Sequence, residues 1–196
     1  MKRSAKVKRK TKETDISINL VIDGKGSSDI NTGIPFMDHM LSLMAAHGFM
    51  DLQIVAQGDT DIDYHHTVED LGICLGMAFD KALGEKRGIK RYGQASIPMD
   101  EALSRVVIDI SNRPYLAYRV LLENSKTGDF DVMLLEEFFR ALVNYTGITM
   151  HCDLISGKDA HHVAESIFKA FGRAIDSATA IEIRLDGDVP STKGIL

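Results

Sequence analysis

The chain has 196 residues and a formal net charge of −5, with 44% hydrophobic and 26% charged residues. These values are typical of a globular protein that can bury a core, and the acidic balance argues against general affinity for nucleic acid. No apolar run reaches the roughly 18 residues that a membrane span needs, and no apolar stretch typical of a secretory signal follows the charged N-terminus.

The first half of the chain is predicted to contain two strands, a helix, a third strand and a second helix. Alternating polar and apolar residues predict strands over residues 6–11 and 16–22, and residues 24–29 read as a turn. Pro35 predicts the first turn of a helix that ends at Gly48. A strand over residues 52–56 and a helix over residues 65–83 follow, and residues 84–88 read as a loop. The first fourteen residues carry seven Lys or Arg and one Glu. An RNA-binding tail is the alternative there, but the alternation favours an edge strand.

The second half repeats this order. Strands are predicted over residues 94–98, 103–110 and 115–122, then a helix over 132–143, a strand over 148–155 and a helix from about Asp159. The order strand, strand, helix, strand, helix recurs, with one extra strand expected in the second half. We therefore expect an α+β fold in which two pseudo-repeated sheet-plus-helices halves, about residues 1–92 and 93–196, pack into a single domain.

A duplicated pentapeptide carries the strongest chemical signal. His65-His66-Thr67-Val68-Glu69 and His161-His162-Val163-Ala164-Glu165 each open a predicted helix after a loop that contains Gly and Asp. The first His and the Glu of each copy are four residues apart and share a helix face, whereas the second His lies a step of about 100° away. Each copy should therefore give a His and a carboxylate to one metal ion and a second His to another. Imidazole and carboxylate together suit a first-row transition metal. The two copies could meet within one chain or across a subunit boundary.

Five motifs extend this signal over most of the chain. They are Pro35-Phe36-Met37-Asp38-His39, Asp63-Tyr64-His65-His66, Arg113-Pro114-Tyr115, Asp159-Ala160-His161-His162 and Pro190-Ser191-Thr192-Lys193-Gly194. Together they strongly resemble the imidazoleglycerol-phosphate dehydratase family, a group of hydro-lyases. The resemblance implies a ribosomal protein S5 domain 2-like fold and the dehydration of imidazole glycerol phosphate to imidazole acetol phosphate in histidine biosynthesis. It also implies two Mn²⁺ ions per active site, bound between the subunits of a 24-subunit shell.

The metal ligands implied by the resemblance are seven residues that match family ligands and one that departs from them. The matching residues are His39, His65, His66, Glu69, His161, His162 and Glu165. Glu137 stands where many relatives have a further His, and we keep it as a ligand because a carboxylate can also bind manganese. Eight protein groups would give four to each ion, which leaves two positions of an octahedral ion for substrate and water.

The resemblance also assigns residues to catalysis and to substrate binding. Glu13 matches a family active-site glutamate and is the leading acid/base candidate, although on its own it reads as a surface carboxylate. Glu69 and Glu165 are grouped with Glu13 as catalytic residues, and His47 matches a position in the substrate cavity. The phosphate of the substrate needs cationic and hydroxyl groups. The residues that match this role are Arg91, Arg113, Ser191, Thr192 and Lys193.

Two other kinds of protein remain open from the residues alone. A dinuclear hydrolase of phosphate esters would use His and carboxylate ligands, but usually with more Asp than is found in these motifs. A shell protein that stores or senses metal would need the ligands but no phosphate-binding cations. His151 reads as a strand-surface residue, and Asp100-Glu101 reads as a turn that helps to hold a nearby cationic residue. Cys74 and Cys152 are predicted to be buried and reduced, which favours a reducing compartment such as the cytoplasm. The resemblance implies a small-molecule phosphate substrate, and neither a nucleic acid nor a membrane is expected as a partner.

Overall fold

Two four-stranded mixed sheets form the outer layers of the protein in the computed structural model, which describes residues 2–196. The first sheet has the order β1 (Ser4–Lys10), β2 (Thr14–Val21), β4 (Asp51–Gly58) and β3 (Ser28–Asn31). The second has the order β5 (Tyr92–Met99), β6 (Ala102–Ile110), β10 (Ile148–Ser156) and β7 (Tyr115–Arg119). In each sheet the last strand in this order runs parallel to its neighbour: β3 to β4 in the first sheet and β7 to β10 in the second. The other neighbouring strands are antiparallel. A short hairpin joins β8 (Lys126–Thr127) to β9 (Phe130–Asp131).

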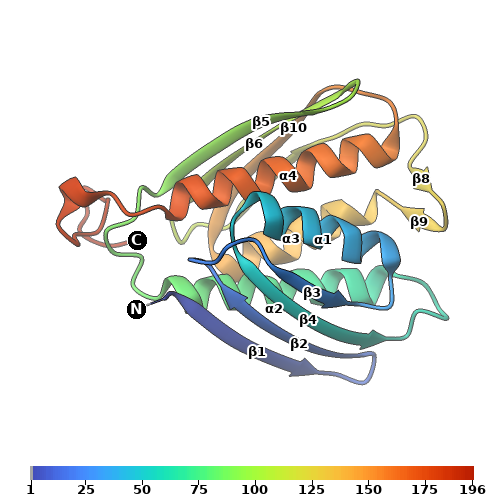
Figure 1. Ribbon diagram of the computed structural model, residues 1–196, viewed down its shortest axis with the longest axis horizontal. Coiled ribbons are helices and arrows are strands. Elements are labelled where there is room, and N and C mark those ends of the chain that lie inside the picture. The colour runs from blue at the N-terminus through green and yellow to red at the C-terminus, as the bar shows by residue number, and fades with distance from the viewer. Residues whose placement is uncertain (1) are drawn as a thin grey trace.

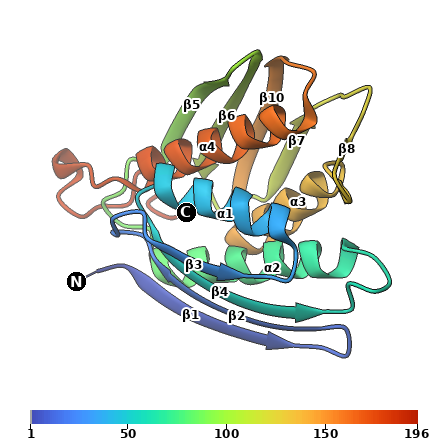
Figure 2. The ribbon, with the colours of Figure 1, turned by 45° about the vertical axis from the view of Figure 1, so that its right-hand side comes forward.

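Four helices lie between the sheets, as Figures 1 and 2 show. They are α1 (Pro35–His47), α2 (His65–Leu83), α3 (Leu134–Thr146) and α4 (Ala160–Thr179), and a 3-10 turn, Ile183–Leu185, follows them. Fully buried phenylalanines on α2, α3 and α4 form the centre of the core. Gly72 allows α2 and α3 to approach closely, because a Cβ atom there would lie 2.3 Å from the carbonyl oxygen of Phe138.

Apart from the β8–β9 hairpin, the two halves have the same sequence of elements, which corrects one part of the sequence prediction. The extra strand expected only in the second half has a counterpart in the first, β3, which starts inside the predicted turn of residues 24–29. This four-residue strand at the sheet edge is held by parallel pairing with β4, a long-range contact that a local sequence pattern does not reveal. The basic N-terminal segment forms β1, as the alternation predicted.

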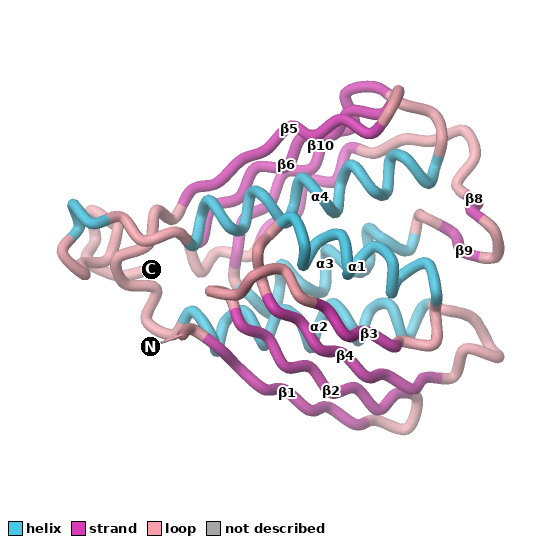
Figure 3. Tube along the Cα trace, viewed as in Figure 1, coloured by secondary structure: helices cyan, strands magenta, loops and turns pink. Residues whose placement is uncertain are grey.

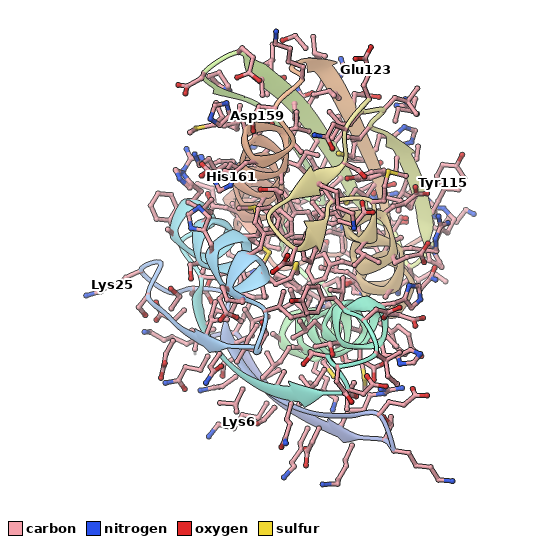
Figure 4. All side chains as sticks on the ribbon, turned by 90° about the vertical axis from the view of Figure 1, so that its right-hand side faces the viewer. Lys6, Lys25, Tyr115, Glu123, Asp159 and His161 are labelled. Carbon is pink, nitrogen blue, oxygen red and sulfur yellow. The ribbon has the colours of Figure 1, made fainter. Side chains whose placement is uncertain are left out.

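The functional candidates fall at two opposite ends of the molecule. The starts of α1, α2 and α4 lie at the same end as the β1–β2 and β5–β6 turns, at the right of Figures 1 and 3. The C-terminal segment lies at the other end, beside the start of β5. Figure 4 looks onto the first end and labels Asp159 and His161 at the start of α4.

Three smaller predictions can be compared directly with the structure. Both cysteines are buried and free. His151 lies on the outward side of β10, beside Tyr115 and Arg119, as expected for a strand-surface residue. Within residues 2–196, none of the helices is both long and apolar enough to cross a membrane.

Candidate functional site

Three of the predicted ligands form a preassembled group between α1 and α4. The Nε2 atoms of His39 and His161 lie 3.0 and 3.1 Å from the same Glu165 oxygen, Oε1. The potential ligand atoms of the three residues all lie within 4.8 Å of one another. Two imidazoles and one carboxylate at this spacing are a donor set that fits a divalent first-row transition metal.

Local capping and packing hold this group in place. The carboxylate of Asp159 accepts hydrogen bonds from the backbone N–H groups of His161 and His162, which fixes the first turn of α4. His161 and Glu165 then share one helix face, and His39 meets them from α1 with its ring centre 5.6 Å from that of His161. The spacing of His161 and Glu165 follows from the sequence, whereas the position of His39 follows from helix packing.

Lys169, which the sequence analysis did not single out, completes the surroundings of Glu165. Its ammonium donates a hydrogen bond to Glu165 Oε2 at 2.6 Å, the oxygen that does not contact the histidines. Burial tends to raise the pKa of Glu165, but the hydrogen bonds from Lys169 and His39 outweigh it and lower that pKa to about 2. Glu165 is therefore an ionised, ligand-ready carboxylate at neutral pH. The spacing of four residues between Glu165 and Lys169 was a signal that could have revealed this contact.

The corresponding group on α2 is more open. His65 Nε2 lies 4.0 Å from Glu69 Oε2, and both side chains are nearly half exposed. Glu137, on α3, faces Arg140, with Oε2 3.6 Å from the Arg140 Nε. The part of the chain that the structure describes contains only one three-residue group with metal-ligand spacing, that of His39, His161 and Glu165. The structure therefore brings together three of the eight predicted ligands.

The second histidine of each pair points away from the first, as the helix geometry predicted. The rings of His65 and His66 are 84° apart in orientation, and those of His161 and His162 are 89° apart. Each of these second histidines contacts a carboxylate through Nδ1. His66 lies 2.9 Å from Asp59 and His162 lies 2.7 Å from Glu101.

These carboxylates orient the histidine rings and raise the pKa values of the two histidines. The hydrogen bond to Asp59 raises the pKa of His66, and the hydrogen bond to Glu101 raises the pKa of His162. The bond to His162 in turn lowers the pKa of Glu101 to about 2. Asp100-Glu101 is a turn, as expected, and the side chain that Glu101 holds is that of His162. Carboxylate partners of this kind commonly orient metal-binding histidines.

Glu13 lies in the β1–β2 turn, close to the first of these histidine–carboxylate pairs. Residues 10–15 and 57–59 line an open cavity of about 280 Å³. The hydrogen bond to Asp59 is the largest cause of the raised pKa of His66, and the charge of Glu13 also contributes to it. His47, at the end of α1, is largely exposed, and the partial burial of its ring, followed by the charges of Lys169 and Arg173, lowers its pKa.

The predicted phosphate-binding residues gather at the opposite end, around Asp109. Arg91 donates to both Asp109 oxygens, at 2.7 and 3.2 Å, and Arg113 Nη2 lies 3.5 Å from Oδ2. The remaining Arg91 amino group donates to the carbonyl of Pro190 at 2.9 Å, which attaches the segment that carries Ser191, Thr192 and Lys193. Sequence analysis did not identify Asp109, although it comes four residues before Arg113.

The phosphate-binding candidates and the metal-binding group of one chain are far apart. Arg91 precedes β5, whereas Glu101, the partner of His162, follows it. An eight-residue strand is about 26 Å long. One chain therefore cannot present both groups to the same small molecule.

Comparison with known proteins identifies the family. Residues 32–175 match the family model described as imidazoleglycerol-phosphate dehydratase. An imidazoleglycerol-phosphate dehydratase of Thiobacillus denitrificans is 57% identical over 194 residues, which cover 99% of this chain and 100% of that protein.

Solved structures of enzymes with this name are also similar. The crystal structure from Staphylococcus aureus aligns with a TM-score of 0.81 and 44% identity, over 91% of this chain and 99% of that one. The one from Pyrococcus furiosus aligns with a TM-score of 0.84 and 38% identity, over 97% of this chain and 100% of that one. The chain therefore belongs to the imidazoleglycerol-phosphate dehydratase family, the hydro-lyases that remove water from imidazole glycerol phosphate in histidine biosynthesis.

Proposed function

We propose that the dehydration takes place at sites assembled between copies of this chain, each copy forming a single catalytic domain of two repeats, about residues 1–92 and 93–196. The observation that carries this proposal is the separation between Arg91 and the group of His39, His161 and Glu165 within one chain. A substrate with an imidazole ring at one end and a phosphate at the other can reach both groups only if they come from different subunits. A closed, symmetric assembly would form every site in the same way.

The proposed assembly is a cytoplasmic shell of 24 subunits with two Mn²⁺ ions per active site. Each ion would be held by the first histidine of one His-His pair, by the glutamate four residues after that histidine, and by one residue from the helix packed beside it. Those sets are His161, Glu165 and His39 on one side and His65, Glu69 and Glu137 on the other. His66 and His162 point away from these groups and are available to complete the sets of neighbouring subunits. When bound to the nitrogens of the substrate ring, the ions would supply positive charge that favours loss of the ring proton.

The remaining steps are assigned to side chains of the protein. The hydroxyl on the substrate carbon attached to the imidazole ring leaves, and Glu13 takes the proton from the next carbon of the side chain, so that the enol of the product ketone forms. Because that carbon is only two bonds from the ring, its base must lie near the metal ligands, and Glu13 is close enough to His66 to affect its pKa. Glu69 and Glu165 serve catalysis as metal ligands, and His47, whose pKa the charge of Lys169 lowers, is assigned to substrate binding.

The phosphate is held at the other end of the substrate. Arg91 and Arg113 are already turned toward one point by Asp109, and Lys193, Ser191 and Thr192 lie on the attached C-terminal segment. A guanidinium can bind phosphate through two parallel hydrogen bonds, which fixes the orientation of the substrate as well as its position.

The activity is tested by assaying the purified protein on imidazole glycerol phosphate after chelation and again after Mn²⁺ is restored. Product formed only in the restored sample is expected. Stoichiometric metal uptake without product would instead favour a storage protein, and activity that survives chelation would contradict the metal requirement.

Sharing of the site between subunits is tested by mixing two inactive variants. Arg113→Ala lacks a phosphate-binding residue and His161→Ala lacks a metal ligand, so neither should turn over substrate alone. When both are co-expressed at equal levels, about one quarter of the sites should combine an intact His161 with an intact Arg113 from another subunit. Recovery of activity in the mixture is expected, and a mixture as inactive as its components would contradict a shared site.

A further inference from the structure

Beneath the β1–β2 turn, a buried hydrogen bond joins the first sheet to α2. Thr14 is 3% exposed and Asp70 is 7% exposed, and the Thr14 hydroxyl donates to Asp70 Oδ2 at 2.5 Å. Arg9 Nη1 lies 2.5 Å from the same oxygen. A buried carboxylate with these two partners ties both strands of the hairpin to the helix that carries His65, His66 and Glu69.

The hydrogen bonds continue from Thr14 to the backbone of Glu13. Thr11 Oγ1 lies 3.3 Å from Thr14 Oγ1, and it accepts the N–H groups of Glu13 and Thr14 at 3.1 and 2.9 Å. The directions of the bonds are mutually consistent. A carboxylate only accepts, so Thr14 donates to Asp70, Thr11 donates to Thr14, and the lone pairs of Thr11 remain free for the two N–H groups.

Asp70 also shares a helix face with His66, the histidine whose pKa is affected by the charge of Glu13. His66 and Asp70 are four residues apart on α2, so both side chains lie on the same side of the helix. The same stretch of α2 therefore sets the position of His66 directly and the position of the Glu13 turn through Asp70.

The second half of the chain lacks this charged connection. Ser166 occupies the place in α4 that Asp70 occupies in α2, five residues after the first histidine, and it contacts Ser104 at 2.6 Å. The turn there carries Glu101, which contacts His162 directly. In the first half the corresponding histidine, His66, contacts Asp59 instead, so Glu13 is available for a different role.

We infer that Asp70, Thr14 and Thr11 are positioning residues that hold Glu13 at a fixed place relative to His66 for proton transfer. The inference rests on the proposed role of Glu13 as the base. A small displacement of a catalytic base can cost a large factor in rate while substrate and metal still bind.

The test is a double-mutant cycle between Thr14 and Glu13. Thr14→Val removes the hydroxyl and keeps the shape, and we expect kcat to fall about 10- to 100-fold with KM and Mn²⁺ content unchanged. Thr14→Ser should retain most of the activity, because it keeps the donor. In a Glu13→Gln background, Thr14→Val should cause no further loss, since the residue it positions is already disabled.

Controls separate positioning from general destabilisation. Thr146→Val removes a similarly buried hydroxyl, which donates only to the Leu142 carbonyl within α3, and it should leave kcat unchanged. If Thr14→Val impairs folding, Thr11→Val tests the same series of hydrogen bonds at a half-buried residue. An unchanged kcat in both Thr14→Val and Thr11→Val, or an equal loss from Thr14→Val in both backgrounds, would overturn the inference. Full activity of Glu13→Gln alone would refute the role of Glu13, and the positioning assignment with it.

Discussion

Lys169 and Glu165 form an ion pair at the edge of the metal-binding group, with Lys169 Nζ 2.6 Å from Glu165 Oε2 and the other carboxylate oxygen turned to His39 and His161. Both partners are largely buried. The lysine therefore stabilises the ionised carboxylate from the side opposite to the ligand position.

Replacing Lys169 by Met should destabilise the metal-free protein in a pH-dependent way. The folded state lowers the pKa of Glu165 from 4.5 to about 2, so the stabilisation that the ionised carboxylate contributes is present above about pH 4.5 and is lost as the pH falls toward 2. At pH 7, Lys169→Met should reduce the free energy of unfolding by about 2 kcal/mol, because a charged hydrogen bond is lost. Urea unfolding at equal subunit concentration measures this effect. It should shrink as the pH approaches 2, and an effect that grew on acidification would contradict the assignment.

Asp59 should control metal binding through the orientation of His66. Because the hydrogen bond to Asp59 raises the pKa of His66, Asp59→Asn changes both its protonation and the position of its ring. Metal competition measured at increasing pH separates the two effects, because a loss of affinity that comes from ring orientation persists after the histidine has lost its proton. We expect Mn²⁺ affinity to fall about 10-fold or more, as is usual when the partner of a metal-binding histidine is removed. Asp61→Asn, in the same loop but exposed, is the matched control, and equal affinities in the two variants would contradict this role.

Asp109 should favour substrate binding although it carries the same sign of charge as the phosphate. It orients Arg91 and Arg113, and Arg91 in turn holds the Pro190 carbonyl. Asp109→Asn should raise KM for the substrate about 10-fold and leave Mn²⁺ content unchanged. A lower KM would show instead that Asp109 competes with the phosphate. Asp153→Asn is a matched control, because Asp153 bridges Arg105 and Arg119 in the same manner on the outer face of the second sheet.

The features predicted correctly from the sequence depend on local geometry. The spacing of His161 and Glu165 determined that they share a face, and the adjacency of His161 and His162 determined that their rings diverge. The strand β3 was not recognised because parallel pairing with β4, rather than its own composition, makes it a strand.

The partners of the site residues depend on contacts between distant segments. Glu101 reaches His162 across 61 residues of sequence, and Arg91 reaches Pro190 across 99. Neither spacing follows a helical or strand period, so no sequence pattern indicates such pairs. The opposite placement of the candidate metal ligands and the candidate phosphate-binding residues is likewise a consequence of the sheet topology.

Glu137 is proposed as a ligand of the ion that His65 and Glu69 would hold. If Glu137 serves the ion bound by His65 and Glu69, Glu137→Gln should lower the Mn²⁺ content from two ions per subunit toward one, because a neutral amide is a poor substitute for a carboxylate. Glu136→Gln is the matched control, since Glu136 is the neighbouring acid and pairs with Arg140 at 2.5 Å. Glu137→His should retain both ions, because imidazole is a suitable ligand in the same place. Metal analysis of the three purified variants measures the outcome, and two tightly held ions in Glu137→Gln would show that Glu137 is not a ligand.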